Sequence, residues 1–342
     1  MNEDLIKLTR EKIIQLLENR PDLPEETESS FKLQSNLSEL VVNPPQESDS
    51  LYLMFKGLDL SELDLSDLNL SYVDFSEADL TNISLKNCIL NHSIFESANM
   101  ANSNLDHVQA KSTNFTQVDL NAATLTHAVF HECDFTDANL SESQAEYCDF
   151  SYCFGEFANF ELAKLEKSKF EKSEFSGSNF DETSLNYCNF EGANLSKSSF
   201  SNCEAQGVNM SFAQLTGIRI FEGSHFTDCT FTQSQANESN WVEASFIGCD
   251  FSYCSLIDAI FTNTNLENSN LKAVNAKEAN FSEANLMNVN LEQANLFQAS
   301  FDKANLNSAN LSGSNCYEAE FLDASIQGAK FNGAQLALTK LA

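Results

Sequence analysis

The side chains with the widest chemical potential in this chain are its ten cysteines, because thiols form disulfides, bind metals and act as nucleophiles. Their spacing argues for a simpler role, since every one of them falls on an apolar position of a five-residue pattern. Cysteine at a regular apolar position behaves as a small buried hydrophobe. We therefore expect free, buried thiols rather than a disulfide framework or a metal site, and reduced thiols favour a cytoplasmic location. The positions are Cys88, Cys133, Cys148, Cys153, Cys188, Cys203, Cys229, Cys249, Cys254 and Cys316.

The five-residue pattern extends over most of the chain. From Phe55 to Ile220, large apolar residues recur at nearly every fifth position, and small residues such as Ala78 and Ala138 stand two positions before them. The apolar spacing is therefore two and then three, which fits neither a helix nor a plain strand. A spacing of two residues is the step of a strand, and the additional residue in the spacing of three must be accommodated at a corner of the chain. A chain that turns at every fifth residue closes into stacked coils, so the sequence predicts a solenoid.

This pattern divides the chain into three segments. Residues 1–20 predict an amphipathic helix over 3–19, and residues 21–50 contain all four prolines and predict an irregular connector. Residues 51–342 carry the repeat without proline, which suits continuous strand pairing. The register moves by one residue within 221–225, and we interpret this as a bulge inside one domain.

The predicted N-terminal helix has two alternative roles. A solenoid needs a cap over its first coil, because that coil otherwise exposes an unpaired strand edge and apolar side chains. An amphipathic helix placed just before the repeat can provide such a cap. In the second interpretation, the helix is a targeting or partner-binding segment that the connector tethers to the repeat.

The repeat resembles that of a known family. Units such as ADLT at 78–81 and ANLS at 193–196 are similar to the A(D/N)LXX consensus of the pentapeptide-repeat family. The resemblance covers residues 51–342 and implies an all-β solenoid, a right-handed four-sided β-helix with four units per coil. At about 4.8 Å per coil, roughly 14 coils give a rod about 70 Å long. Like residues also recur at a period of 20, for example Phe55 and Phe75, which supports this closure independently.

Composition and missing motifs exclude several classes of function. A net charge of −31 with only three arginines argues against a nucleic-acid ligand and against anionic membrane surfaces. The sequence contains no run of about 18 apolar residues, so it predicts no membrane span, and the N-terminus lacks the features of a signal peptide. The five histidines are scattered over the expected surface, and a solenoid offers no concave pocket. We therefore expect no catalysis, no cofactor and no metal.

Outward-facing aromatic residues close to lysines form the best candidate for a binding surface. Exposed aromatic residues next to lysine are typical of protein–protein sites. Tyrosine also tolerates strand surfaces and lysine also increases solubility, so these residues have a purely structural alternative. The sequence predicts a non-catalytic scaffold that binds a partner protein of unknown identity. The candidate residues are Tyr147, Tyr152, Phe154, Phe157, Lys164, Lys167 and Tyr187.

An acidic surface on the first coils supports a second hypothesis. The resemblance implies that members of the quinolone-resistance group mimic DNA and bind a type II topoisomerase such as gyrase. Residues 51–342 carry −25 of the net charge, or one charge per ~2.8 Å of rod against ~1.7 Å in duplex DNA. However, the acid is concentrated at one end and no inserted loop projects, so DNA mimicry is the alternative. The candidate acidic face comprises Asp59, Glu62, Asp64, Asp67, Asp74, Glu77 and Asp79.

The last coil is the candidate site of self-association. The pattern continues to Leu341 without a following helix or charged tail, so we expect an open strand ladder flanked by Leu336 and Leu338. A second copy that meets this end about a two-fold axis would bury it on both chains. In the alternative, the last residues fray and shield the core themselves.

Overall fold

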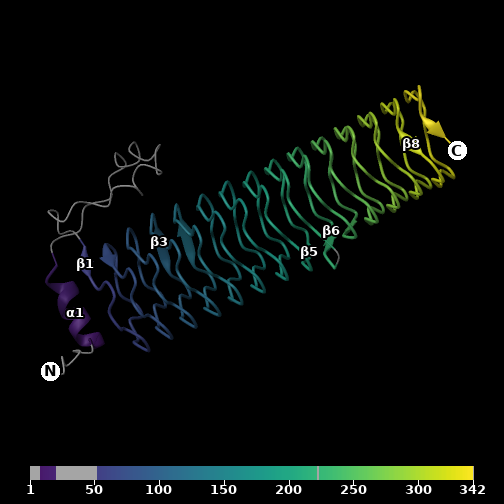
Figure 1. Ribbon diagram of the computed structural model, residues 1–342. Coiled ribbons are helices and arrows are strands. Elements are labelled where there is room, and N and C mark those ends of the chain that lie inside the picture. Colours follow the sequence, from purple (N-terminus) through teal and green to yellow (C-terminus); the bar gives the residue numbers. More distant parts are fainter. Residues whose placement is uncertain (1–7, 21–51, 222, 342) are drawn as a thin grey trace, which may run out of the picture.

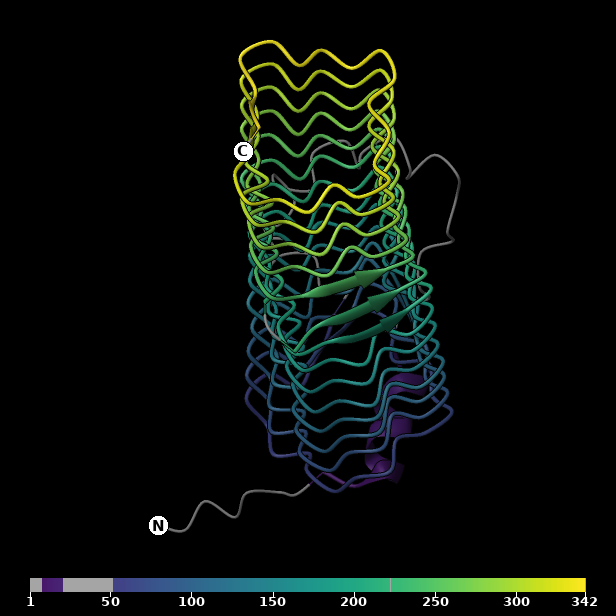
Figure 2. The same ribbon diagram turned by 90° about the vertical axis from the view of Figure 1, so that its right-hand side faces the viewer.

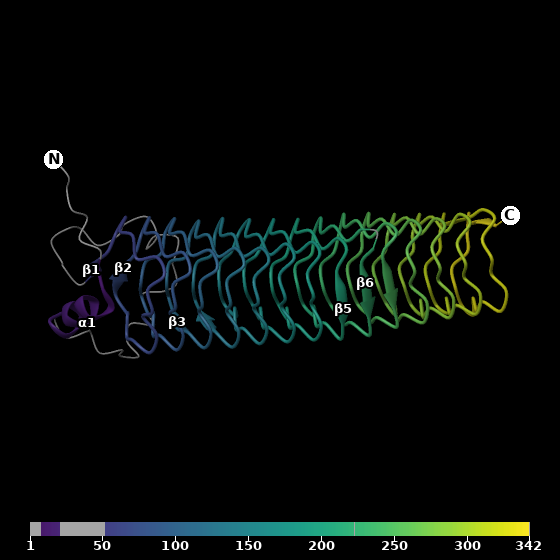
Figure 3. The ribbon, with the colours of Figure 1, turned by 90° about the horizontal axis from the view of Figure 1, so that it is seen from below.

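The computed structural model describes residues 8–20, 52–221 and 223–341. The repeat forms parallel coils stacked into one rod, with helix α1 (Arg10–Glu18) at the first coil and β9 at the last (Figures 1 and 3). The predicted all-β solenoid with one short N-terminal helix is confirmed. The short strands are β1 (Leu53–Met54), β2 (Val73–Asp74), β3 (Gln109–Lys111), β4 (Val129–His131), β5 (Glu204–Gln206), β6 (His225–Thr227), β7 (Ser245–Ile247), β8 (Glu320–Phe321) and β9 (Lys340–Leu341).

Each coil pairs in parallel with the next coil at a separation of 20 residues. Asp59 pairs with Asp79 in this way, and the same register continues up to the coil that contains β5. There the separation becomes 21, because Ala205 pairs with Phe226. One additional residue therefore lies between these coils. The chain accommodates it near Gly223, whose φ is +81°, and returns to a separation of 20 between β6 and β7.

The geometry of a single unit explains the five-residue consensus. In the unit around Leu80, Ala78 and Leu80 point into the core and are buried. Asp79 points outward, and its Oδ1 accepts a hydrogen bond from the Thr81 N–H at 3.1 Å. Asn82 then turns the corner with a left-handed φ of +56°. A non-glycine residue in this region costs about 1 kcal/mol, and the aspartate or asparagine that caps the preceding turn offsets that cost.

Rings of successive coils stack along the axis in the core. The ring centroids of Phe75 and Phe95 lie 4.9 Å apart, and those of Phe95 and Phe115 lie 5.1 Å apart. Farther along the rod, Trp241 stacks on Phe261 at 5.5 Å. Each buried ring contributes roughly 1.5–3 kcal/mol, so the core is stable without disulfides. All ten cysteines are free and buried, as predicted.

Helix α1 begins later than the sequence pattern predicted. The expected start was near residue 3, whereas Thr9 is the N-cap and its hydroxyl accepts from the Lys12 N–H at 3.4 Å. The helix ends at Glu18, and Asn19 caps it. Residues 1–7 and the expected connector 21–50 lie outside the described residues.

Helix α1 packs on the first coil (Figure 2). Ile13 is fully buried in the core, and Leu16 and Leu17 pack against it. The Arg10 guanidinium donates to the carbonyl oxygens of Asp64 and Ser66, and Arg20 donates to those of Asn69 and Ser71. In later coils the equivalent carbonyls accept from the preceding coil, as in the bond from the Leu65 N–H to the Ser84 oxygen. The two arginines therefore donate the hydrogen bonds that the N–H groups of an earlier coil would donate, and α1 covers the first coil.

Candidate interaction surfaces

One coil carries a large apolar side chain at each of its four corners. Tyr147, Tyr152, Phe157 and Leu162 all have a φ of about +60°, and they are 47, 43, 60 and 47% exposed. Because these residues occupy successive corners of a four-sided coil, they point to different sides of the rod. A flat partner can contact two neighbouring corners of this coil at once, together with the face between them.

The corner that contains Tyr147 forms a continuous stack of side chains, which we call the Tyr147 edge. It runs through His107, His127, Tyr147, Lys167 and Tyr187. His107 and His127 stack at 5.1 Å, and His127 stacks on Tyr147 at 4.8 Å. Lys167 then donates from Nζ to the Tyr147 hydroxyl at 3.0 Å and lies 5.0 Å from the ring centroid. This hydrogen bond raises the pKa of Lys167, so the lysine stays charged.

The next corner along the chain forms the Tyr152 edge, which includes Tyr152, Lys172, Phe212 and Tyr253. The Lys172 Nζ lies 5.7 Å from the centroid of the Tyr152 ring. Phe212 and Tyr253 are 54 and 56% exposed. The sequence prediction did not include these two residues. Phe212 follows Tyr152 by three coils of 20 residues, and Tyr253 joins the same column once the additional residue near Gly223 is counted.

The Tyr147–Tyr152 face lies between these two edges. Its middle carries Asp149 and Lys169 on successive coils, with Nζ and Oδ2 4.0 Å apart. Lys167 and Lys172 flank this pair at the two edges, and among the described residues neither forms an ion pair. Each instead lies over a tyrosine ring. The face therefore presents two cations at fixed places, each held by an exposed aromatic residue.

The structure does not bring all the predicted binding residues together. Tyr147, Lys167 and Tyr187 lie on one edge of the face and Tyr152 on the other. Phe157 points to a different side, and its ring lies against Gly177, where an added Cβ would be 2.6 Å from it. Phe154 is half-buried on the adjoining face and Lys164 is exposed on the preceding face. The seven residues therefore surround the rod instead of forming one patch.

The predicted acidic face is also distributed around the rod. Asp59 and Asp79 share one side, while Glu62, Asp67 and Glu77 lie at three different corners. Many of these carboxylates have structural partners: the Asp67 Oδ1 accepts from the Asn87 side chain at 2.9 Å, and Glu77 pairs with Lys56 at 3.1 Å. Asp64 accepts from the Ser66 N–H at 3.0 Å and lies 3.7 Å from Arg10.

The assignment of Asp74 to an exposed acidic face is wrong. Asp74 is only 8% exposed, and its Oδ1 accepts hydrogen bonds from the N–H and the hydroxyl of Ser76. The carboxylate caps a turn at the position that Asp and Asn share throughout the repeat. An outward position in the five-residue pattern therefore does not guarantee exposure.

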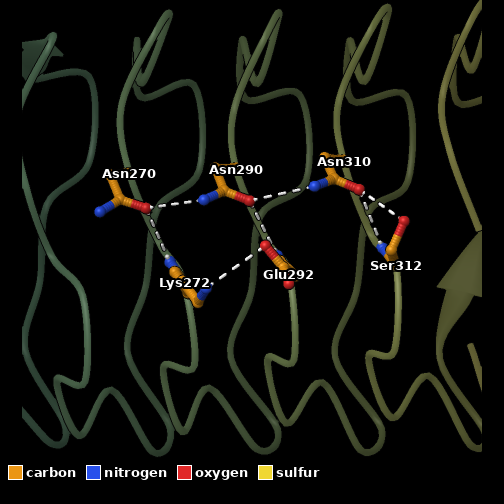
Figure 4. Close-up of polar contacts among 6 residues, drawn as sticks. All are labelled: Asn270, Lys272, Asn290, Glu292, Asn310 and Ser312. Carbon is orange, nitrogen blue, oxygen red and sulfur yellow. Dashed lines mark hydrogen bonds and ion pairs between the residues drawn. The ribbon is translucent and has the colours of Figure 1, made fainter.

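The second half of the rod replaces carboxylates with ladders of asparagine (Figure 4). The Asn290 Nδ2 donates to the Asn270 Oδ1 at 3.0 Å, and the Asn310 Nδ2 donates to the Asn290 Oδ1 at 3.4 Å. Each oxygen also accepts from a backbone N–H two residues later, such as that of Glu292 at 3.2 Å. Aspartate can accept in this position but cannot donate along the ladder. This surface is therefore rigid, neutral and satisfied by its own hydrogen bonds.

The last coil leaves apolar side chains partly exposed. Leu306 and Leu311 are fully buried, whereas Ile326, one coil after Leu306, is 40% exposed. Leu336 is half-buried against the core, and Leu338 is 67% exposed at a corner. The backbone of Leu341 belongs to β9, which pairs with β8. Ile326, Leu336 and Leu338 thus give this end of the rod a partly apolar surface.

Among the described residues, no helix is long and apolar enough to cross a membrane. No group of three or more histidine, cysteine or carboxylate side chains converges in a way that could hold a metal ion. Both statements apply to the part of the chain that the structure describes.

Sequence profiles of one family match most of the repeat. The profile of the pentapeptide repeat region matches residues 156–224 and 254–331. The profile of pentapeptide repeats in eight copies matches residues 55–87, 78–117, 113–151 and 224–263. Among curated proteins, none matches the chain.

Several solved structures are similar at low sequence identity. QnrB1, a plasmid-mediated fluoroquinolone resistance protein, is 21% identical over 50% of this chain and 90% of its own, with a TM-score of 0.42. HetL from Nostoc sp. strain PCC 7120 is 18% identical over 82% of this chain and 88% of its own, with a TM-score of 0.17. Rfr23 from Cyanothece 51142 is 21% identical over 40% of this chain and 90% of its own, with a TM-score of 0.16. The profiles, the consensus and the coil geometry agree: this chain belongs to the pentapeptide-repeat family.

Proposed function

We propose that this protein is a non-catalytic rod in the cytoplasm that binds a partner protein through the Tyr147–Tyr152 face. The single observation that carries this proposal is the pair of tyrosine–lysine stacks at the two edges of that face. The same coil carries Phe157 and Leu162 on its other corners, without lysines above them. The two sides of one coil therefore differ in chemistry and not in backbone geometry.

The lysines indicate the chemistry of the partner. Lys167 and Lys172 have no carboxylate partner among the described residues, although the chain as a whole is strongly acidic. Aromatic rings hold them in place at an exposed site, where a cation–π contact contributes about 0.5–1 kcal/mol. A partner surface that brings two carboxylates to these cations and apolar side chains to the tyrosine rings would complement the face.

The test is affinity capture with matched variants. The wild-type protein, a Tyr147→Ala/Tyr152→Ala variant and a Phe157→Ala/Leu162→Ala variant are immobilised and exposed to a lysate of the organism of origin. Each double variant removes two exposed apolar side chains from left-handed corners of the same coil. We expect one protein to be captured by the wild type and by the Phe157/Leu162 variant, and to be lost from the Tyr147/Tyr152 variant.

A second pair of variants tests the role of charge. Lys167→Glu/Lys172→Glu should abolish the same capture, whereas Lys197→Glu/Lys330→Glu makes an identical charge change elsewhere on the rod and should leave it intact. Equal loss in both lysine variants would mean that net charge, and not this face, determines binding. Equal loss in both corner variants would refute a specific face.

DNA mimicry is the second candidate function, and the charge of the first coils favours it. Glu62, Asp67 and Glu77 are exposed at corners there. Because the acidic residues surround the rod and several pair with neighbours, they form a weaker imitation of duplex DNA than the count alone indicates. Direct binding of purified gyrase, lost after replacement of Glu62, Asp67 and Glu77 by Gln, would favour this candidate.

We also propose that two copies associate through the last coil. Ile326, Leu336 and Leu338 leave an apolar end surface that a second copy would bury. Residues 271–342 have a net charge of only −2, so electrostatic repulsion opposes this contact little. The association would place two Tyr147–Tyr152 faces on one particle and allow bivalent binding of the partner.

A further inference from the structure

The coil that carries the Tyr147–Tyr152 face also exposes two apolar side chains on its opposite side. The four corners of this coil follow in the order Tyr147, Tyr152, Phe157 and Leu162. The side between the last two corners therefore lies opposite the Tyr147–Tyr152 face, and we call it the Phe157–Leu162 face. Phe157 and Leu162 are both exposed, and neighbouring exposed apolar side chains are typical of binding surfaces.

The Phe157–Leu162 face holds its apolar side chains beside a rigid polar strip. The Phe157 ring rests on Gly177 of the next coil, which has no side chain to displace it. Asn159 lies midway between the two corners, and its Nδ2 donates to the Oδ1 of Asn139 in the preceding coil at 3.4 Å. The two apolar side chains therefore have fixed places at the edges of this face.

Three carboxylates surround the apolar pair at corners of the neighbouring coils. Asp137 precedes Phe157 by one coil, and Glu142 and Glu182 precede and follow Leu162 by one coil. All three are exposed. Among the described residues, none of the three carboxylates forms an ion pair or a side-chain hydrogen bond. The Phe157–Leu162 face thus combines apolar contact area with unpaired negative charge.

We propose that the Phe157–Leu162 face is a second binding surface whose partner is a basic amphipathic segment. Apolar side chains of that segment contact Phe157 and Leu162, and its lysines or arginines contact the three carboxylates. Opposite charges across an interface orient a partner and exclude partners of like charge. Since the Tyr147–Tyr152 face presents cations instead, the partner of one face does not fit the other.

Lys197 limits this surface on one side. It lies two coils after Phe157 at the same corner, and its charge repels a basic segment. The segment therefore lies over the coils that carry Asp137, Phe157 and Glu182 and extends toward the first coil. Because the two faces are on opposite sides of the rod, one molecule can hold two different proteins. This inference does not depend on the proposed function, since it uses no residue of the Tyr147–Tyr152 face.

The experiment measures binding of a synthetic probe to the full chain by fluorescence anisotropy. The probe is a labelled peptide of leucine and lysine, about 18 residues long, with leucines at the i, i+3, i+4 and i+7 positions of an amphipathic helix. The same peptide with glutamate in place of lysine is the control for charge. We expect the lysine peptide alone to bind, and added salt to weaken its binding.

Matched variants locate the probe on the rod. Phe157→Ala/Leu162→Ala should lower the affinity at least about tenfold, whereas Tyr147→Ala/Tyr152→Ala on the opposite side should change it by less than about twofold. Replacing the three carboxylates by amides should also cost about tenfold, because each exposed ion pair changes an affinity by up to about fivefold. This variant is Asp137→Asn/Glu142→Gln/Glu182→Gln, and its control at other exposed corners is Asp228→Asn/Glu243→Gln/Asp323→Asn.

Three results would overturn the proposal. The wild-type protein does not bind the lysine peptide, or the two amide variants lose equal affinity, or the Phe157/Leu162 variant binds as well as the wild type. In the last two cases net charge alone attracts the probe. Light scattering tests a second copy of this chain as the occupant. A higher mass that Phe157→Ala/Leu162→Ala and Lys167→Glu/Lys172→Glu each abolish would assign the face to that copy and contradict a basic segment.

Discussion

The ring of Phe175 occupies the space beside the α-carbon of Gly155, one coil earlier in the same core column. A Cβ added to Gly155 would lie 2.0 Å from the Phe175 Cε1. Phe175 also meets Phe160 edge-on at 5.6 Å and Phe170 at 5.4 Å. The glycine therefore leaves no cavity, because the neighbouring coil fills its place.

This relationship predicts strong coupling between the two positions. Gly155→Ala should destabilise the protein by about 1–3 kcal/mol through overpacking. Backbone strain does not contribute, because Gly155 does not have a left-handed φ. Phe175→Leu shortens the ring that causes the clash, so the double variant should be more stable than the sum of the single variants predicts. Chemical denaturation of the four proteins measures the coupling, and strict additivity would contradict the contact.

In the asparagine ladder, the loss of one amide donor should reduce the stability of the protein more than the addition of one negative charge. Asn290→Asp removes the donor to Asn270 and should cost about 1–2 kcal/mol. Gln293→Glu adds the same charge at an exposed corner three residues later and should change the stability by less than about 0.5 kcal/mol. The measurement is the denaturation midpoint of each variant at neutral pH. Equal shifts would mean that charge alone is responsible.

The two arginines of the cap should protect the first coil from exchange. Arg10→Ala/Arg20→Ala leaves the carbonyls of Asp64, Ser66, Asn69 and Ser71 without their donors. We expect faster amide hydrogen exchange in residues 58–72, by a factor of about ten or more. Lys12→Ala removes a cation from the exposed side of the same helix and should leave exchange unchanged. Unchanged exchange in the arginine variant would show that Ile13 and its apolar neighbours hold the cap alone.

The contact of the cap with Asp64 should depend on pH. Hydrogen bonds from Ser66, followed by the charge of Arg10, hold the pKa of Asp64 below its usual value of 3.8. Because the folded-state pKa is lowered, this stabilisation is complete above about pH 4 and is lost as the pH falls through the folded value. Hydrogen exchange of α1 should therefore accelerate in acid more in the wild type than in Asp64→Asn. An identical acid response would refute this role of Asp64.

The end surface predicts a specific change of mass in solution. Leu338→Lys and Leu341→Glu together should convert a dimer at micromolar concentration into a monomer, as judged by light scattering. Ile260→Lys alters an exposed apolar residue on an earlier coil of the rod and is the control. A monomeric wild-type protein at tens of micromolar would contradict association through this end.

The period of five identifies most of the structure because it states directly which side chains point inward. Phe75, Phe95 and Cys153 all occupy the core positions that their place in the unit predicts. The start of α1 was less accessible, since Thr9 competes with earlier capping residues and only packing selects among them. Asp74 was misplaced because the pattern gives the direction of a side chain and not what covers it.

The candidate face required information that a pattern of five alone does not contain. Tyr147 and Tyr152 are five residues apart and flank one face, but Phe157 is also five residues from Tyr152 and points elsewhere. Only the closure at 20 residues separates these directions. Phe212 joins the Tyr152 edge by the period of 20 alone, whereas Tyr253 joins it only after the change of register near Gly223 is included.

Photo-crosslinking from two corners of one coil tests the proposed binding face most directly. Tyr187 lies on the Tyr147 edge, and Lys197 lies two corners away on the same coil, with a similar left-handed φ. Each is replaced in turn by p-benzoylphenylalanine, and the protein is irradiated in a lysate of the organism of origin. The proposed function predicts a crosslink to one partner protein from position 187 and none from position 197. Crosslinks of equal yield from both positions, or from position 197 alone, would contradict it.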